Sequence, residues 1–207
     1  MLAHGAGAGQ ASRFIVDFAT ALAGRGVDVL TFNFLYTEER RKVPDRTLLL
    51  EACYGAVVDT ARTLPPFAGN KLFIGGKSMG GRMATHLAAA SPEHRRGAGP
   101  EHSRGARDAT AAALSGVVVL GYPLHPPGKP EKLRIEHLPR ITVPVLIVQG
   151  ERDPFGSPEE LRPHFAVLGD RATIHAVAGG DHSLAVRGAK QKEDLPGVVT
   201  SWIQHHL

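Results

Sequence analysis

Two kinds of hydrophobic pattern alternate along the chain. Five short, mainly apolar segments fit strands, and four longer stretches have the apolar spacing of amphipathic helices. The runs at 117–120 and 145–148 contain no polar residue, which is typical of strands covered on both faces. The other strands are expected at 27–34, 72–75 and 173–177, and the helices at 12–23, at 47–64, directly after Ser78 and at 198–206. This alternation predicts an α/β fold with a mostly parallel, doubly wound sheet and helices on both faces.

The segment 91–110 has no apolar periodicity. It is rich in Gly, Ala, Arg, His and Pro, a composition typical of a mobile surface loop. Its histidines, His94 and His102, lack the spacing and the partners of metal ligands, so we expect no metal site there. The chain length suits one domain, and we expect a single domain over residues 1–207 with a mobile insertion at 91–110.

Composition and charge narrow the class of protein. Hydrophobic residues make up 43% of the chain and charged residues 21%, which is ordinary for a globular protein. The net charge is +4 and the pI about 9.5, but the basic residues form no stripe interleaved with aromatics, so nucleic-acid binding is not expected. The single cysteine, Cys53, cannot form an internal disulfide, which suits a reducing compartment. Without a signal-peptide pattern or a membrane-length apolar run, the chain is expected to be cytoplasmic with no membrane partner.

The most informative motif is Gly-Lys-Ser-Met-Gly at residues 76–80. It follows the strand expected at 72–75 and opens a helix, so Ser78 stands at the apex of a strand–turn–helix, as in the nucleophile elbow of G-x-S-x-G hydrolases. Side chains in place of the two glycines would collide with the neighbouring strand and helix. A chain this rich in glycine contains such a motif by chance about once in ten cases, so it needs support from other residues. A phosphate-binding loop would require glycine where the chain has Lys71, which argues against nucleotide binding.

A serine nucleophile needs a base, and the base needs a third group that holds its tautomer. Asp153 lies in a turn-rich segment after the strand expected at 145–148, and His182 follows the last expected strand. Ser78, Asp153 and His182 thus occur in the order of nucleophile, acid and base in α/β-hydrolases. Reactive groups in parallel sheets gather beyond the carboxyl ends of the strands. We therefore predict a catalytic triad of Ser78, Asp153 and His182.

Each assignment has an alternative. Asp153 precedes Pro154 and could serve only to shape a turn, and Glu151 is a rival acid nearer to the strand. Asp181 and His182 could form a surface pair. The other histidines are less suitably placed: His175 within an expected strand, His86 within an expected helix, and His205 and His206 at the far end.

Acyl transfer also requires backbone N–H donors for the oxyanion that develops. The amide of Met79, directly after the nucleophile, is one candidate. The second is expected in the His-Gly-Ala-Gly loop at residues 4–7, where we favour the amide of Ala6, with Gly7 as the rival. The alternative for this loop is a flexible glycine-rich tail.

Motifs spread over nearly the whole chain together resemble one family. They are His4-Gly5-Ala6-Gly7, Phe32-Asn33-Phe34, the segment from Gly76 to Arg82, the segment from Gly121 to Gly128, and the segment from Gly150 to Gly156. The chain is similar to a small, dienelactone-hydrolase-like branch of the α/β-hydrolases, which includes testis-expressed protein 30 and the third subunit of the animal NSL chromatin complex. The resemblance implies an α/β-hydrolase fold with a strand at residues 1–3 between those at 27–34 and 72–75. Family members have more strand residues before the histidine-glycine loop, so we expect N-terminal strands to be missing here.

The expected function is that of a serine hydrolase acting on a small-molecule ester or activated acyl group, with no cofactor and no metal. Candidate residues for the wall of the substrate site are His4, Tyr122, His125 and Lys129. The last three lie in a proline-rich loop that could equally be a rigid connector. A catalytically silent interaction module of the same fold is the alternative. A shortened N-terminus could expose a sheet edge, which would favour a homodimer.

Overall fold

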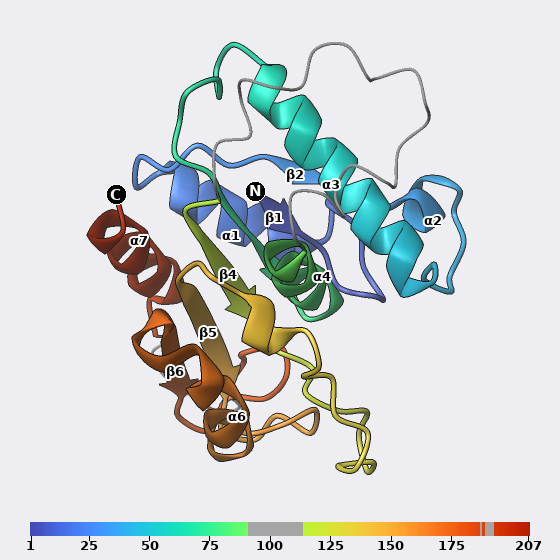
Figure 1. The fold of residues 1–207 in the computed structure, drawn as a ribbon, viewed down its shortest axis with the longest axis vertical. Helices are drawn as coiled ribbons and strands as arrows, with labels where there is room; N and C mark the ends of the chain where they lie inside the picture. The colour runs from blue at the N-terminus through green and yellow to red at the C-terminus, as the bar shows by residue number, and fades with distance from the viewer. Residues whose placement is uncertain (91–113, 187, 189–192) are drawn as a thin grey trace.

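A parallel sheet of six strands carries the candidate site residues (Figure 1). The structure is a computed structural model that describes residues 1–90, 114–186, 188 and 193–207. Neighbouring strands follow the order β2-β1-β3-β4-β5-β6, and every pairing is parallel. The strands are β1 (Leu2–Ala3), β2 (Thr31–Phe32), β3 (Phe73–Lys77), β4 (Gly116–Leu120), β5 (Val145–Gly150) and β6 (Ala172–Val177). The predicted parallel sheet is confirmed.

Helices cover both faces of this sheet (Figure 1). Helices α1 and α7 contact each other on one face, whereas α3 and α4 pack together on the other. The helices are α1 (Arg13–Ala23), α2 (Leu35–Glu38), α3 (Thr47–Thr63), α4 (Met79–Ala89), α6 (Pro158–Phe165) and α7 (Leu195–His205), with 3-10 turns at η2 (Leu138–Arg140) and η3 (Ala166–Arg171).

The uninterrupted apolar runs of β4 and β5 serve two hydrophobic cores. In β4, Val117 and Val119 belong to the core shared with α3 and α4, whereas Val118 and Leu120 belong to the core shared with α1 and α7. The apolar residues of β5 alternate between the two cores in the same way. Because successive side chains of a strand point to opposite faces, a sheet covered on both sides needs an apolar residue at every position.

Strand β1 lies between β2 and β3, as the family resemblance implies. Leu2 is in register with Thr31 on one side and with Gly75 on the other. The strand expected at 27–34 is wrong in extent, because β2 comprises only two residues. A ladder is only as long as its shorter member, and β1 offers two residues for pairing.

Helix α6 is absent from the pattern-based expectation. Half of its residues are polar or charged, and its buried residues are Pro158, Leu161 and Phe165. The start of the helix is nevertheless encoded, since Ser157 Oγ accepts from the amide of Glu160 and the Glu160 carboxylate accepts from the amide of Ser157. This capping box is a readable sequence signal for a helix start. Helix α2 has four residues, too few to show a period.

The insertion expected at 91–110, with His94 and His102, lies outside the described residues. Cys53 lies half-buried in α3. Within the described ranges, no helix is both long enough and apolar enough to cross a bilayer.

Candidate active site

Ser78 occupies a strained turn between β3 and α4. Its φ of 51° and ψ of −115° are backbone angles that residues with a side chain rarely adopt. A Cβ at Gly76 would lie 2.5 Å from the carbonyl oxygen of Ala3, and one at Gly80 would lie 2.6 Å from that of His4. The two glycines therefore allow the turn to pack directly against β1 and the loop that follows it.

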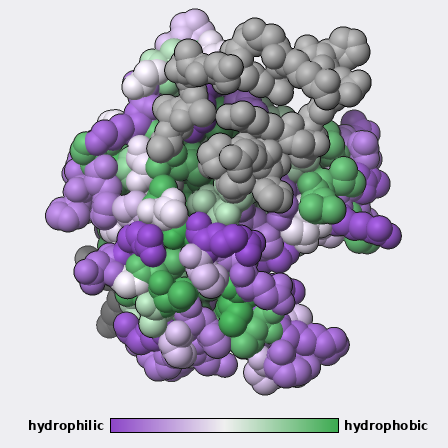
Figure 2. All heavy atoms as spheres, in the orientation of Figure 1, coloured by the Kyte–Doolittle hydropathy of each residue, from purple (hydrophilic) through white to green (hydrophobic). Residues whose placement is uncertain are grey.

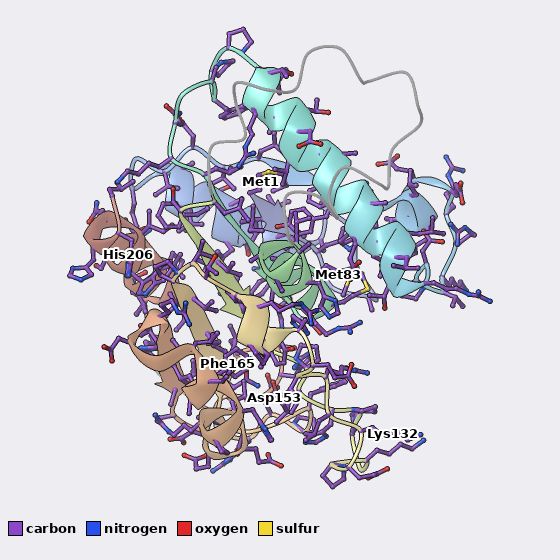
Figure 3. The ribbon with its side chains drawn as sticks, viewed as in Figure 1. Met1, Met83, Lys132, Asp153, Phe165 and His206 are labelled. Atoms are coloured by element: carbon purple, nitrogen blue, oxygen red, sulfur yellow. The ribbon has the colours of Figure 1, made fainter. Side chains whose placement is uncertain are left out.

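The structure brings the three predicted triad residues into one hydrogen-bonded row. His182 Nε2 lies 2.8 Å from Ser78 Oγ, and His182 Nδ1 lies 2.7 Å from Asp153 Oδ2. With its proton on Nδ1, the imidazole donates to Asp153 and accepts from the serine hydroxyl. The three residues follow β3, β5 and β6, so they meet at the carboxyl edge of the sheet; Figure 3 labels Asp153 beyond β5.

A buried network that the sequence analysis did not identify holds Asp153, whose side chain is 0% exposed. Gln149 Nε2 donates to Asp153 Oδ2 at 2.9 Å, and the amide of Phe155 donates to Oδ1 at 2.8 Å. Gln149 Oε1 accepts from the amide of Tyr122 at 2.6 Å, which couples the acid to the loop after β4. The sequence did carry a signal for this role, because Gln149 is a polar residue directly after the apolar run of a buried strand.

The ring of His182 is supported on one side by Phe155, with 4.2 Å between the ring centroids. The rival residues are engaged elsewhere. Glu151 accepts a hydrogen bond from the amide of Gly179 at 2.8 Å, so it ties its own turn to the loop after β6. The rings of His86 and His175 each contact a glutamate, at 2.7 and 2.6 Å.

The loop after β1 lies against the serine. A Cβ at Gly5 would be 3.5 Å from the Cβ of Ser78. His4 anchors this loop from inside: its Nδ1–H donates to the carbonyl of Gly5 at 2.8 Å, and its Nε2 accepts from the amide of Phe34 at 3.2 Å. Burial lowers the pKa of His4, which favours the neutral ring that this pair of hydrogen bonds requires. The expected histidine-glycine loop is thus an ordered part of the fold.

The candidate oxyanion donors lie in two elements. Met79 is the first residue of α4, where the backbone amide has no acceptor within the helix. The hydroxyl of Tyr36 donates to the carbonyl of Ala6 at 3.0 Å and so fixes the loop tip. Ala6 and Gly7 are both exposed, and the choice between their amides stays a prediction.

The candidate wall residues differ in exposure. His4 and Tyr122 are 0% exposed, so the structure gives their side chains internal supporting positions rather than a place on an open wall. The hydroxyl of Tyr122 donates to the carbonyl of Arg134 at 2.5 Å. His125 is buried as well, and Lys129 is exposed.

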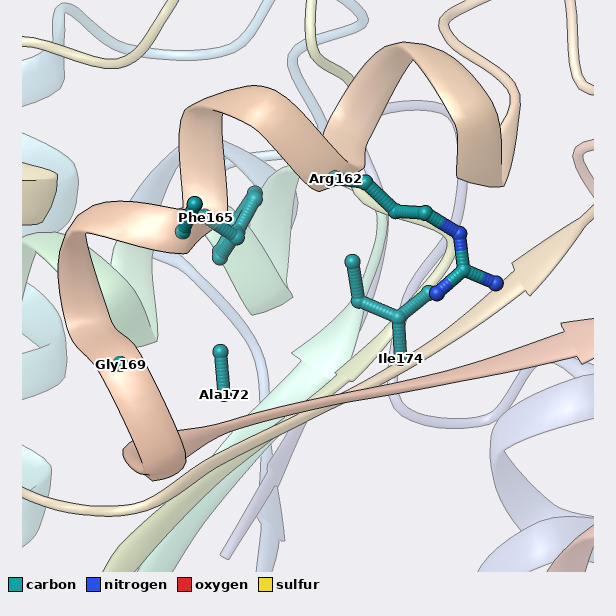
Figure 4. A pocket seen from close by; sticks show the side chains of 6 residues that line it. Arg162, Phe165, Gly169, Ala172 and Ile174 are labelled. Atoms are coloured by element: carbon teal, nitrogen blue, oxygen red, sulfur yellow. The ribbon is translucent and has the colours of Figure 1, made fainter.

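A cavity of about 270 Å³ lies elsewhere, between α6, η3 and β6 (Figure 4). Phe165, Ala172 and Ile174 line it with the side chain of Arg162. Ala172 begins β6, so the cavity lies by the amino end of that strand, away from the edge where the triad residues meet. Figure 2 also shows the surface hollowed at one side, between the region of α2 and the loop that carries Lys132.

Fold and site geometry together have the form of an α/β hydrolase. A family model described as an alpha/beta hydrolase domain matches residues 1–204, and the chain therefore belongs to that family. The predicted superfamily is confirmed.

Solved structures agree on the fold. The dienelactone hydrolase of Anabaena variabilis is 21% identical with a TM-score of 0.65, and the match covers 100% of this chain and 85% of that one. An α/β serine hydrolase without lid from Xanthomonas campestris is 16% identical with a TM-score of 0.70, covering 100% and 82%. The monoacylglycerol lipase of Paleococcus ferrophilus is 17% identical with a TM-score of 0.68, covering 100% and 93%. At these identities the likeness concerns the fold.

Proposed function

We propose that the protein is a serine hydrolase that cleaves a carboxylic ester or a similarly activated acyl group. The observation that supports this most directly is the row of hydrogen bonds from Ser78 through His182 to Asp153, with distances of 2.8 and 2.7 Å. These distances lie within the range required for proton transfer between nucleophile and base. The burial of Asp153 keeps its carboxylate from turning toward water.

In this mechanism Ser78 Oγ attacks the carbonyl carbon of the ester while His182 Nε2 takes the hydroxyl proton. Asp153 holds the Nδ1–H side of the ring and stabilises the imidazolium. The N–H groups of Met79 and Ala6 donate to the oxyanion of the tetrahedral intermediate. The bond to the leaving alcohol then breaks, and His182 gives its proton to the alcohol oxygen. A water molecule releases the acyl group by the same steps, with His182 again acting as base.

The first test is covalent labelling. The parent protein, Ser78→Ala and His182→Ala are each mixed with a fluorophosphonate, and their intact masses are recorded. We expect one adduct on the parent and none on either variant, because labelling requires an activated serine hydroxyl. Thermal melting of all three shows whether the variants remain folded. A folded parent with no adduct would favour the catalytically silent interaction module instead.

Hydrolysis assays then address the substrate. The panel consists of p-nitrophenyl acetate as a general ester, together with a dienelactone and a monoacylglycerol, which two of the structural neighbours suggest. The motifs quoted in the sequence analysis support the narrower proposal of a place in the branch with testis-expressed protein 30 and the third NSL subunit. The single cysteine supports the proposal of a cytoplasmic location.

A further inference from the structure

Lys77 fills the first variable position of the Gly-x-Ser-x-Gly motif, and its side chain turns toward the loop that carries His182. Its Nζ donates a hydrogen bond to the backbone carbonyl of His182, a contact between residues 105 positions apart. We propose that Lys77 is a positioning residue: its ammonium group holds the loop that carries His182 in the position from which the ring contacts both Ser78 and Asp153. This inference rests on the proposed hydrolase function.

Space for the contact comes from Gly121, the residue after β4. Gly121 has a φ of 75°, and a Cβ there would lie 2.9 Å from Lys77 Nζ and 3.1 Å from the carbonyl oxygen of His182. It would also lie 3.5 Å from Cε1 of the His182 ring. A side chain at this position would therefore occupy the place where the lysine meets the histidine loop.

Apart from this contact, backbone hydrogen bonds tie the loop that carries His182 to itself and to the turn after β5, where Glu151 accepts from the amide of Gly179 and the amide of Arg152 donates to the carbonyl of Gly180 at 2.8 Å. The carboxylate of Asp181 accepts from the amides of Ser183 and Ala185, at 2.8 and 3.2 Å, and the amide of Leu184 returns to the Asp181 carbonyl at 2.8 Å. These bonds shape the turn but do not link it to the strand that carries the nucleophile. The bond from Lys77 supplies that link, since Lys77 is the last residue of β3.

The surroundings of Lys77 favour a tight contact. Its Nζ lies 5.8 Å from the ring centroid of Phe14 in α1, and the charged groups that act on it are the carboxylates of Asp153 and Asp181. Burial lowers the pKa of Lys77 to about 8, although the two carboxylates oppose the shift. The group is thus mainly protonated at neutral pH and loses its charge in mildly alkaline solution.

The kinetic test compares Lys77→Met, Lys77→Arg and the matched control Lys71→Met, which makes the same change at an exposed lysine before β3. With p-nitrophenyl acetate, we expect Lys77→Met to lower kcat by about 10- to 100-fold with little change in KM, because a base displaced by a fraction of an ångström transfers protons slowly. The control should match the parent. In the parent, kcat/KM should fall above about pH 8 as Lys77 loses its proton; Lys77→Arg, which stays charged, should remove that fall.

A second measurement does not depend on turnover. Hydrogen exchange of the full-length protein should be about tenfold faster in the peptide covering residues 178–186 in Lys77→Met than in the parent or in Lys71→Met. Unchanged exchange there, or parent-like kcat with an alkaline fall that persists in Lys77→Arg, overturns the proposal. If Lys77→Met has a clearly lower Tm than the parent, the pH dependence of kcat/KM in Lys77→Arg above about pH 8 decides instead. A parent that neither hydrolyses the ester nor takes the fluorophosphonate refutes the hydrolase function, and hydrogen exchange still decides whether Lys77 anchors the loop.

Discussion

The strain at Ser78 can be measured by comparing two variants that both abolish its hydroxyl. Ser78→Ala and Ser78→Gly lose the same hydrogen bond to His182, and both keep the backbone bond from the Ser78 amide to the carbonyl of Leu120. They differ in the Cβ alone. Alanine retains a Cβ at a φ of 51° and ψ of −115°, whereas glycine adopts these angles without a steric penalty.

The expected difference follows from three effects. Backbone strain of this kind costs about 1–3 kcal/mol, all of which glycine relieves. Glycine is also freer in the unfolded chain, which offsets about 0.4–1 kcal/mol. Loss of a half-buried methyl group removes about 0.4 kcal/mol more, half the value for a fully buried one. The glycine variant should therefore be the more stable of the two by about 1 kcal/mol.

Urea denaturation followed by circular dichroism measures this difference directly, and thermal melting should show a Tm higher by about 2–4 °C for Ser78→Gly at this chain length. Ala56→Gly, at an exposed position within α3, is the control and should have the opposite sign, with a loss of about 1 kcal/mol. A glycine variant as stable as Ser78→Ala, or less stable, would refute a backbone strain of about 2 kcal/mol at this turn.

Two further changes test the packing of the site, and a third tests His137, which precedes η2 and whose ring stacks on that of His86 in α4 with 3.8 Å between the centroids. Gly80→Ala should lower the free energy of unfolding by more than about 3 kcal/mol, measured in guanidinium chloride, because the new Cβ would meet a main-chain oxygen 2.6 Å away; Gly55→Ala in α3, with only a side-chain atom at 3.7 Å, should be neutral or stabilising. Gln149→Leu should lower the free energy of unfolding by about 3 kcal/mol and reduce kcat, because it removes a donor to Asp153 and leaves buried polar groups without hydrogen-bond partners. Full activity and parent-like stability of this variant would contradict the role given to Gln149. Burial lowers the pKa of His137 to about 3, so on acidification the unfolded chain takes up a proton before the folded one does. The free energy of unfolding should therefore decrease as the pH falls from about 6.5 toward 3. Urea melts across that range should show a dependence on pH that is weaker in His137→Asn by up to about 1.4 kcal/mol per pH unit.

The parts of the fold that the sequence predicts well are those in which local pattern and burial agree. The runs at 117–120 and 145–148 become β4 and β5 because both faces of those strands are covered. The order Ser78, Asp153, His182 also anticipates which side chains meet, since parallel strands bring their carboxyl ends to one edge.

Other features depend on partners that no local pattern reveals. The segment 27–34 has strand-like residues, yet β2 is only as long as the two residues of its neighbour allow. The role of Gln149 depends on a carboxylate and a carbonyl in the turn after β5 and on an amide in the loop after β4. The contact of Lys77 with the carbonyl of His182 depends on the absence of a side chain at Gly121, and this matters only once the carboxyl ends of β3, β4 and β6 meet at one edge of the sheet.

The row of hydrogen bonds at the candidate site has a consequence for the order in which the chain folds. Asp153 and His182 are 29 residues apart and flank adjacent strands, so their contact can form once β5 and β6 pair. Ser78 is 104 residues from His182 and joins only when β4 has closed the sheet between β3 and β5. Contacts of such long sequence separation form slowly. Recovery of fluorophosphonate labelling during refolding should therefore lag behind the return of the helical circular dichroism signal. The rate at which Ser78 becomes reactive would then report when the sheet is complete.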